Sequence, residues 1–265
     1  MKKELIVGGR MGSSKCCPKS YEPLAYCDEE NVETLDGHIS TMLSVYDKYF
    51  GSRGWEQLSA PRANISKNII GKVVKCTIIL HDMGKLFYQN RIKAGRGAAL
   101  HEYYSLLVTE EISKGLIRYL GEEKAIDSME WAILVHHMSL RDPVKIFSNI
   151  VNIAKYWKVP LSVKMTKETS EWISRTFSHH LGFKIKLQAD SVISLRKTTK
   201  VVRRLTTNLL DFYPLALRLT RVLIITDNYA AALNRGGAPT KRVFLRDLPI
   251  EGALIEARRR LRAWL

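Results

Sequence analysis

Hydrophobic residues recur at intervals of three and four along most of the chain, a spacing that places them on one face of an α-helix. Within the range Val32–Phe50, for example, Leu35 and Ile39 begin such a face. With glycines, prolines and capping residues as boundaries, the pattern predicts helices over about 32–50, 65–80, 98–120, 122–138, 142–157, 166–181, 214–234 and 250–264. Residues 183–206 are basic and fit either a helix or a pair of strands. The sequence therefore predicts an all-α fold.

The two ends of the chain differ from the predicted helical body. Residues 1–30 contain glycines and prolines without a sustained period, which predicts an irregular N-terminal segment. We expect one domain over 31–240 and a basic helix over 241–265 that packs on or beside it. No apolar run approaches the ~18 residues that a membrane-spanning helix needs, and the N-terminus lacks the apolar core of a signal peptide. We therefore expect a soluble, cytoplasmic protein without a membrane partner.

Positive charge is concentrated in the second half of the chain. The 265 residues carry a formal net charge of +16. Residues 1–140 hold 18 lysines and arginines against 17 acidic residues, whereas residues 141–265 hold 24 against 9. Such an asymmetry indicates a polyanionic partner, with nucleic acid ahead of an anionic membrane surface. The alternative interpretation is a basic surface that only keeps the protein soluble.

Several histidines and aspartates fall beside the apolar faces of the predicted helices or at helix ends. They are His38, His81, Asp82, His101, His136, His137 and Asp227. Asp227 lies among isoleucine, leucine and valine, where an isolated carboxylate is costly unless it is paired or bound to metal. A single histidine in such a place is usually a hydrogen-bonded core residue. Seven such side chains together predict a metal site between helices.

In their order along the chain, these residues resemble the HD phosphohydrolase superfamily. Within it, the order is similar to that of the CRISPR-associated HD nuclease of type I interference systems. Residues 81–85 read HDMGK, followed by Phe87 and Gln89, and look like the "HD-x-G-K" stretch of that family. The pair His136-His137 looks like its double histidine. Because no Walker motif or helicase follows, the resemblance, over about 35–235, is to the stand-alone form.

The resemblance implies an HD-domain helical bundle over 31–240 that holds two divalent metal ions. One ion would be bound by His38, His81, Asp82 and Asp227, and the other by Asp82, as a bridge, with His101, His136 and His137. Two such ions can activate a water and stabilise both the attacking and the leaving oxygen of a phosphodiester. Imidazole-rich ligation favours Mn, Fe, Co, Ni or Zn over Mg. The resemblance narrows the expectation to Mn, Co or Ni, with Mg, Fe or Zn as alternatives.

The resemblance further implies a metal-dependent nuclease that hydrolyses single-stranded DNA, with RNA as a further substrate. Its partners would be a separate CRISPR-associated helicase subunit and a crRNA-guided Cascade-type complex. Besides Asp82, we expect a catalytic role for Lys85, which would hold the scissile phosphate; the alternative is an ordinary surface lysine. Three further residues, Arg91, Lys93 and Arg96, form a predicted basic loop before His101 that could guide a strand; the alternative is a loop that is only solvated.

Other candidates and readings stay open at this point. Arg141, just beyond the double histidine, is one more candidate phosphate contact. A second adjacent pair, His179-His180, matches no position of the family pattern, and we expect no metal role for it. A runner-up function is an HD phosphohydrolase that acts on a nucleotide or cyclic dinucleotide, although the GYP signature of the cyclic-dinucleotide branch is missing after His137. A third reading is a non-catalytic basic nucleic-acid-binding subunit.

Overall fold

The computed structural model describes residues 22–137 and 150–235, and helices dominate this part of the chain. The helices are α1 (Leu35–Tyr49), α2 (Trp55–Arg62), α3 (Lys67–Leu80), α4 (Gln89–Lys93), α5 (His101–Leu120), α6 (Glu123–Val135), α8 (Ile150–Tyr156), α9 (Lys167–Leu181), α10 (Thr198–Thr207) and α11 (Leu209–Asn234). Three 3-10 turns are η1 (Gly51–Arg53), η2 (Met83–Tyr88) and η3 (Leu195–Lys197). The predicted all-α class is confirmed.

Two short antiparallel strand pairs accompany the helices. The strands are β1 (Leu24–Cys27), paired with β2 (Val32–Thr34), and β3 (Ser162–Lys164), paired with β4 (Val192–Ser194). The expectation of an irregular segment up to residue 30 is therefore wrong for β1, whose Leu24 is fully buried. Gln89 anchors this hairpin, because its side-chain oxygen accepts from the Leu24 amide at 2.7 Å.

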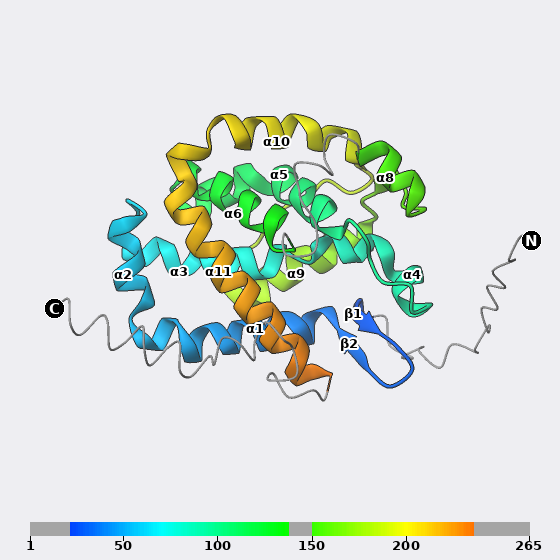
Figure 1. Cartoon of the computed structure of the whole chain (residues 1–265), viewed down its shortest axis with the longest axis horizontal. Coiled ribbons are helices and arrows are strands. Elements are labelled where there is room, and N and C mark those ends of the chain that lie inside the picture. The colour runs from blue at the N-terminus through cyan, green and yellow to red at the C-terminus, as the bar shows by residue number, and fades with distance from the viewer. Residues whose placement is uncertain (1–21, 138–149, 236–265) are drawn as a thin grey trace, which may run out of the picture.

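The long helix α11 crosses the molecule between α10 and α1, with α3, α5 and α6 behind it (Figure 1). It packs against α6 and α1, and α6 packs in turn against α5. One hydrophobic core runs through these helices, from Leu24 in the first hairpin to Ala230 near the end of α11. The ends of α3 and α6 and the start of α5 are therefore held within a single rigid framework.

Capping hydroxyls mark the start of two helices. The helix predicted from about residue 32 begins only at Leu35, because Val32–Thr34 form β2. Thr34 precedes α1, and its hydroxyl accepts a hydrogen bond from the Gly37 amide at 3.1 Å. Thr166 precedes α9 and caps the Thr169 amide at 3.2 Å, as the sequence predicted. Such a side chain satisfies one of the amides that have no partner inside the helix.

Tertiary packing overrides the sequence signal in three places. Helix α2 was not predicted, and it forms because Trp55 packs edge-on against Tyr46, with ring centroids 6.3 Å apart. Helix α11 begins before the predicted start at Pro214, because the preceding turn buries Phe212. The open segment 183–206 divides into a strand, β4, that pairs with β3 and a helix, α10.

Some predictions fall outside the described residues. Of the predicted helix over 142–157, the structure describes α8 and the residues after it. Arg141 and the predicted basic helix over 241–265 lie outside the described ranges. Among the helices of the described ranges, none has the length and apolar character that crossing a bilayer demands.

Candidate metal centre

The HD dipeptide lies where α3 gives way to η2, in the interior of the molecule. His81 caps the C-terminus of α3, and Asp82 follows it as the residue before η2. Both side chains are buried. The apolar face of α3 packs against α5, α6 and α11, so the end of this helix points its polar residues into the space between them.

Three of the predicted ligands share one arrangement of the imidazole ring. In each, Nδ1 donates a hydrogen bond to the carbonyl oxygen three residues earlier: His81 to Ile78 at 2.7 Å, His101 to Ala98 at 2.7 Å and His136 to Ile133 at 2.6 Å. Because a carbonyl only accepts, this bond places a proton on Nδ1, so that in the neutral ring Nε2 carries the lone pair. Metal-binding histidines are oriented in this way, by a hydrogen bond from the second ring nitrogen.

Two of these Nε2 atoms have no hydrogen-bond partner within the described part of the protein. They belong to His81 and His136, and both atoms are buried. A buried polar atom without a partner costs about 1–3 kcal/mol, so native structures seldom leave one unexplained. Two such nitrogens, whose ring centroids lie 5.4 Å apart, fit ligation of divalent metal. The residues present therefore suit the ions that the sequence predicted.

A carboxylate takes the place of the backbone carbonyl behind His38, on α1. The Nδ1 atom of His38 lies 2.7 Å from Glu33 Oε1, and the Nε2 atom of His38 lies 3.1 Å from Asp227 Oδ1. Glu33 is itself buried and accepts from Asn234 at 2.7 Å and from Arg235 at 2.9 Å, two residues where α11 ends. A carboxylate behind a histidine raises the basicity of the facing nitrogen. Sequence reasoning missed Glu33.

Asp82 lies between two groups of donors. Its Oδ1 is 2.9 Å from His101 Nε2, while its Oδ2 is 3.4 Å from His81 Nε2 and 3.7 Å from His38 Nε2. The two oxygens of one carboxylate therefore face different histidines. This is the arrangement that a bridging ligand between two ions requires.

The remaining donors divide in the same way. The ligating atoms of His38, His81 and Asp227 lie within 4.8 Å of one another, and so do those of His101, His136 and His137. The structure thus brings all seven predicted ligands together and sorts them into two groups on either side of Asp82. The fold achieves this with residues from α1, α11 and the ends of α3, α5 and α6.

The charges of the centre favour deprotonated ligands on one side. Burial and the neighbouring His101 lower the pKa of His137 to about 4, and burial with His137 holds the pKa of His136 well below its usual value. Although burial alone would raise it, the charges of His81 and Lys85 hold the pKa of Asp82 well below its usual value. Neutral imidazoles and an ionised carboxylate are the forms that bind a metal ion.

His38 differs from these two histidines in the direction of its pKa shift. Burial alone would lower its pKa, but the hydrogen bonds to Asp227 and Glu33 raise it to about 9. The pKa of Asp227 is lowered, because the His38 contact outweighs burial. Metal binding must therefore displace a proton from His38, and affinity will rise with pH.

Close backbone packing sets the distance between the HD segment and His101. The Gly84 amide donates to Ser105 Oγ at 2.8 Å, and a Cβ on Gly84 would lie only 2.0 Å from the His101 carbonyl oxygen. Leu100, the residue before His101, has a left-handed φ of 65°, a conformation that costs a non-glycine residue about 1–2 kcal/mol. The glycine of the HDMGK segment thus serves contact with α5.

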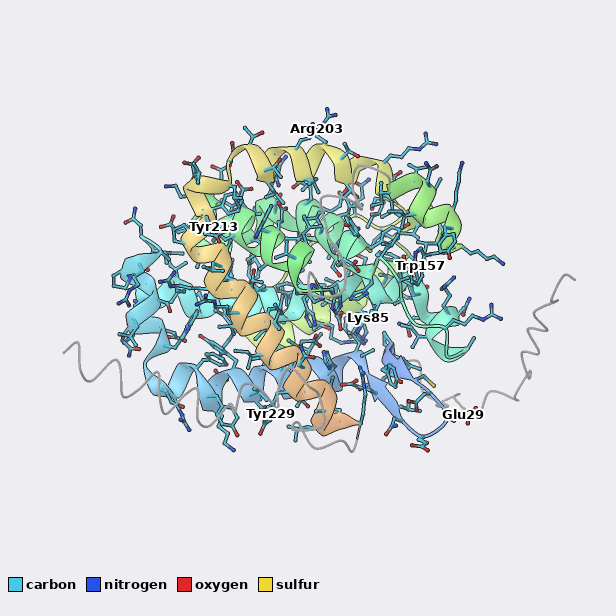
Figure 2. All side chains as sticks on the ribbon, viewed as in Figure 1. Glu29, Lys85, Trp157, Arg203, Tyr213 and Tyr229 are labelled. Carbon is cyan, nitrogen blue, oxygen red and sulfur yellow. The ribbon has the colours of Figure 1, made fainter. Side chains whose placement is uncertain are left out.

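Lys85 lies at the centre and contacts the bridging carboxylate. Its Nζ is 2.5 Å from Asp82 Oδ2, and its side chain is 13% exposed. It lies near the middle of the molecule in Figure 2. A lysine that is mostly buried and paired with Asp82 is not an ordinary surface lysine. Its ammonium group is close enough to share an anionic ligand with the metal centre.

The predicted basic loop is corrected in part. Arg91 and Lys93 lie in helix α4, because Ile92 is buried and anchors a helical turn there. Arg91 donates to the Lys158 carbonyl at 3.1 Å, so it braces the chain after α8. Arg96 is exposed in the loop between α4 and α5, as expected.

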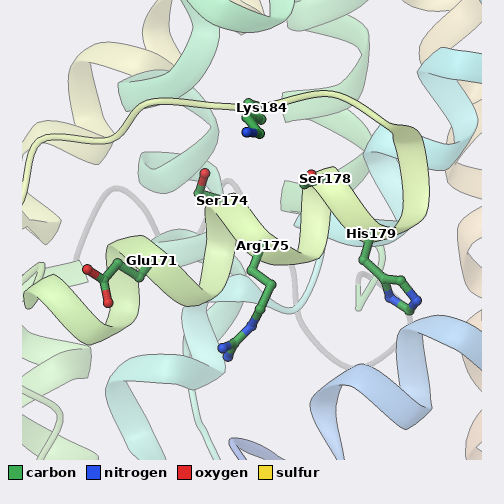
Figure 3. A pocket seen from close by; sticks show the side chains of 6 residues that line it. All are labelled: Glu171, Ser174, Arg175, Ser178, His179 and Lys184. Atoms are coloured by element: carbon green, nitrogen blue, oxygen red, sulfur yellow. The ribbon is translucent and has the colours of Figure 1, made fainter.

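The second histidine pair lies away from these seven residues, at the end of α9. His180 Nε2 is 3.2 Å from Asp36 Oδ1, and His179 is exposed. The donor atoms of these three residues also lie within 4.8 Å of one another. In Figure 3, His179 and Arg175 point to the same side of α9, away from Lys184, beside a cavity of about 440 Å³. The pair is a separate group, in which His179 is exposed and the His180 side chain is mostly buried.

Comparison with known proteins adds no family assignment. No protein-family model matches the chain, and no curated protein matches its sequence.

Proposed function

We propose that this chain is a metal-dependent hydrolase of phosphodiester bonds in single-stranded DNA, with single-stranded RNA as a further substrate. The observation that carries the proposal is the pair of buried Nε2 atoms of His81 and His136, which have no hydrogen-bond partner among the described residues. They lie in one centre with the two carboxylates Asp82 and Asp227. Imidazole and carboxylate donors in this mixture suit transition-metal ions ahead of Mg, and among these ions the resemblance points to Mn, Co or Ni.

The residues of the centre divide the work of such a hydrolysis. Two divalent ions, when bound, lower the pKa of a water molecule and stabilise negative charge on phosphate oxygens. Asp82 offers one carboxylate oxygen to each group of donors, so it can bridge the two ions. Lys85, 2.5 Å from Asp82 Oδ2, adds a positive charge where a phosphate oxygen would approach. Glu33 holds the His38 ring in the orientation that ligation needs.

A polymer is the better candidate substrate than a nucleotide. The excess positive charge of the chain suits a polyanion and exceeds what a single nucleotide would need. The resemblance to the stand-alone CRISPR nuclease supplies the proposed context, in which a helicase subunit and a crRNA-guided complex deliver the displaced strand.

The proposal is tested by a cleavage assay on the purified full chain. Labelled single-stranded DNA should be degraded with Mn²⁺ or Co²⁺, and EDTA should stop the reaction. Asp82→Asn should reduce cleavage to the level seen in EDTA. The matched control is Asp190→Asn, at an exposed aspartate with a left-handed φ of 66° that asparagine tolerates well.

Two results would contradict the proposal. Full-rate cleavage by Asp82→Asn would remove the bridging carboxylate from the mechanism. Metal-dependent hydrolysis of nucleotides or cyclic dinucleotides, with no action on DNA or RNA, would favour the small-molecule phosphohydrolase instead. The salt dependence separates the two, because binding of a polymer falls steeply with salt and binding of a nucleotide does not.

A further inference from the structure

Two aromatic side chains project into solvent where α8 ends. Tyr156 is 84% exposed and Trp157 is 46% exposed. Their rings lie 6.3 Å apart at an angle of 75°. Figure 2 places Trp157 on the side of the molecule where α8 and α4 lie. Adjacent exposed aromatic side chains make this surface a candidate interaction site.

The surroundings of this pair are basic. Exposed lysines flank it on both sides, so that residues 155–158 read Lys-Tyr-Trp-Lys. Residues 150–165 contain no aspartate or glutamate, and neither do residues 83–100, which hold Lys85, Arg91, Lys93 and Arg96. The hydrogen bond from Arg91 to the Lys158 carbonyl, at 3.1 Å, joins the two segments into one surface.

A cavity is lined by residues of both of these segments. Its volume is about 350 Å³, and its lining includes Leu86, Arg91 and Lys158. Leu86 follows Lys85, whose ammonium contacts Asp82, and Lys158 follows Trp157. A hollow of this size, at the lower end of the range of ligand pockets, has room for one small group such as a nucleobase.

We propose that Lys155, Tyr156, Trp157 and Lys158, which we call the α8 platform, bind single-stranded nucleic acid. Bases stack on Tyr156 and Trp157, and the lysines contact the phosphates between them. The strand then continues past Arg91 towards Lys85. This direction rests on the proposed function of the metal centre, whereas binding at the platform does not.

The chemistry of the surface selects this partner over others. Lysine is depleted in the cores of protein–protein interfaces, yet two lysines flank these rings. Duplex nucleic acid keeps its bases stacked internally, so it offers no base face to Trp157. A single strand offers both base faces and phosphates, which match a pair of adjacent aromatic side chains flanked by lysines.

The test measures binding separately from cleavage. The full chain carrying Asp82→Asn, in EDTA, is titrated into fluorescently labelled oligothymidylate and oligouridylate, and anisotropy gives the dissociation constant. Tyr156→Ala with Trp157→Ala should raise that constant about tenfold or more, since base stacking contributes strongly to such complexes. Replacing both with phenylalanine should restore most of the affinity. The matched control is Tyr213→Ala, at a residue that is 43% exposed and lies on α11, on the other side of Figure 2 from Trp157.

The salt dependence identifies the role of the lysines. Lys155→Gln with Lys158→Gln should weaken binding and reduce the slope of log affinity against log salt, whereas the aromatic double variant should leave that slope unchanged. Comparison of the two oligonucleotides separates DNA from RNA as the preferred strand.

Each outcome bears on a different claim. Binding by the double alanine variant within twofold of the parent would overturn the platform, even if the protein cleaves DNA. Loss of binding in that variant, with the phenylalanine variant intact, would support the platform even if no cleavage is found with any metal. No binding of either oligonucleotide by the parent protein would overturn it outright. Circular dichroism checks that the variants keep the helical fold.

Discussion

Two pairs of adjacent histidines close two helices of this protein, and they differ in what their ring nitrogens contact. His136 and His137 follow α6, and His179 and His180 end α9. In sequence the two pairs look alike. In the structure His136 is buried beside His81 and His101, whereas His179 is exposed on the surface.

The difference lies in which side of the ring the protein satisfies. In His136, Nδ1 donates to the Ile133 carbonyl, and Nε2 has no hydrogen-bond partner among the residues that the structure describes. In His180 it occupies Nε2 with the Asp36 carboxylate, at 3.2 Å. A buried nitrogen kept unpartnered has a reason to be so, whereas a nitrogen paired with a carboxylate near the surface is already satisfied. Adjacency of histidines alone therefore does not mark a catalytic metal site.

The largest effect separates the two pairs directly. His136→Ala should reduce cleavage of single-stranded DNA more than about 100-fold, because even residues behind a metal ligand cost 10–100-fold when removed. His179→Ala should leave the rate within about twofold of the parent. Initial rates in Mn²⁺ provide the measurement. An equal loss of cleavage rate in both variants would contradict the difference in role between the two pairs.

The carboxylates that contact His38 and His180 should differ in their effect on metal binding. Glu33→Gln should weaken metal binding by about 10–100-fold, because the carboxylate behind His38 no longer supports its ring. Asp36→Asn, which removes the carboxylate that pairs with His180, should leave metal affinity unchanged. Isothermal titration with Mn²⁺ or Co²⁺ compares them. If Asp36→Asn weakens metal binding more than Glu33→Gln does, the ion binds beside His180 and not at the candidate metal centre.

Glycines near the two regions provide a third contrast. Gly84→Ala would place a Cβ 2.0 Å from the His101 carbonyl oxygen, so we expect a loss of about 3 kcal/mol of unfolding free energy and of most activity. Gly182, after His180, has open space around it and a φ of 64°, so Gly182→Ala should cost about 1–2 kcal/mol and spare the activity. Urea unfolding and cleavage rates test both; a stable, active Gly84→Ala would refute the close packing.

The smallest effect concerns stability at the second pair. His180→Gln removes the contact between a mostly buried imidazole and the Asp36 carboxylate, whose side chain is 44% exposed, so the free energy of unfolding should fall by about 1 kcal/mol or less. Thermal unfolding in EDTA measures it. The shift should be the same with and without Mn²⁺, since we expect no ion there; a larger loss in Mn²⁺ would show that the metal uses this pair.

Much of the centre could be predicted because several of its ligands lie at predicted helix ends or within apolar runs. His81 and His136 come where apolar periodicity stops, and Asp227 interrupts an apolar run. Helix ends leave carbonyls without intrahelical partners, and the histidines use these to orient their rings. The two-group arrangement, by contrast, came from the resemblance and not from spacing.

The rest depends on contacts between distant segments. Glu33 lies in a three-residue strand without periodicity, and its partners Asn234 and Arg235 come about 200 residues later. The sequence predicts a loop at Arg91 because Gly95 and Gly97 follow it. In the structure, Arg91 lies in a turn of helix that the buried Ile92 anchors. Such features follow from tertiary packing, which outweighs local propensity.

Anomalous diffraction from a crystal of the full chain soaked in Mn²⁺ tests the central claim most directly. The account predicts two peaks, ~3.5–4 Å apart, on either side of Asp82, with His38, His81 and Asp227 around one and His101, His136 and His137 around the other. No peak beside Asp82, or a peak only at Asp36 and His180, would contradict it.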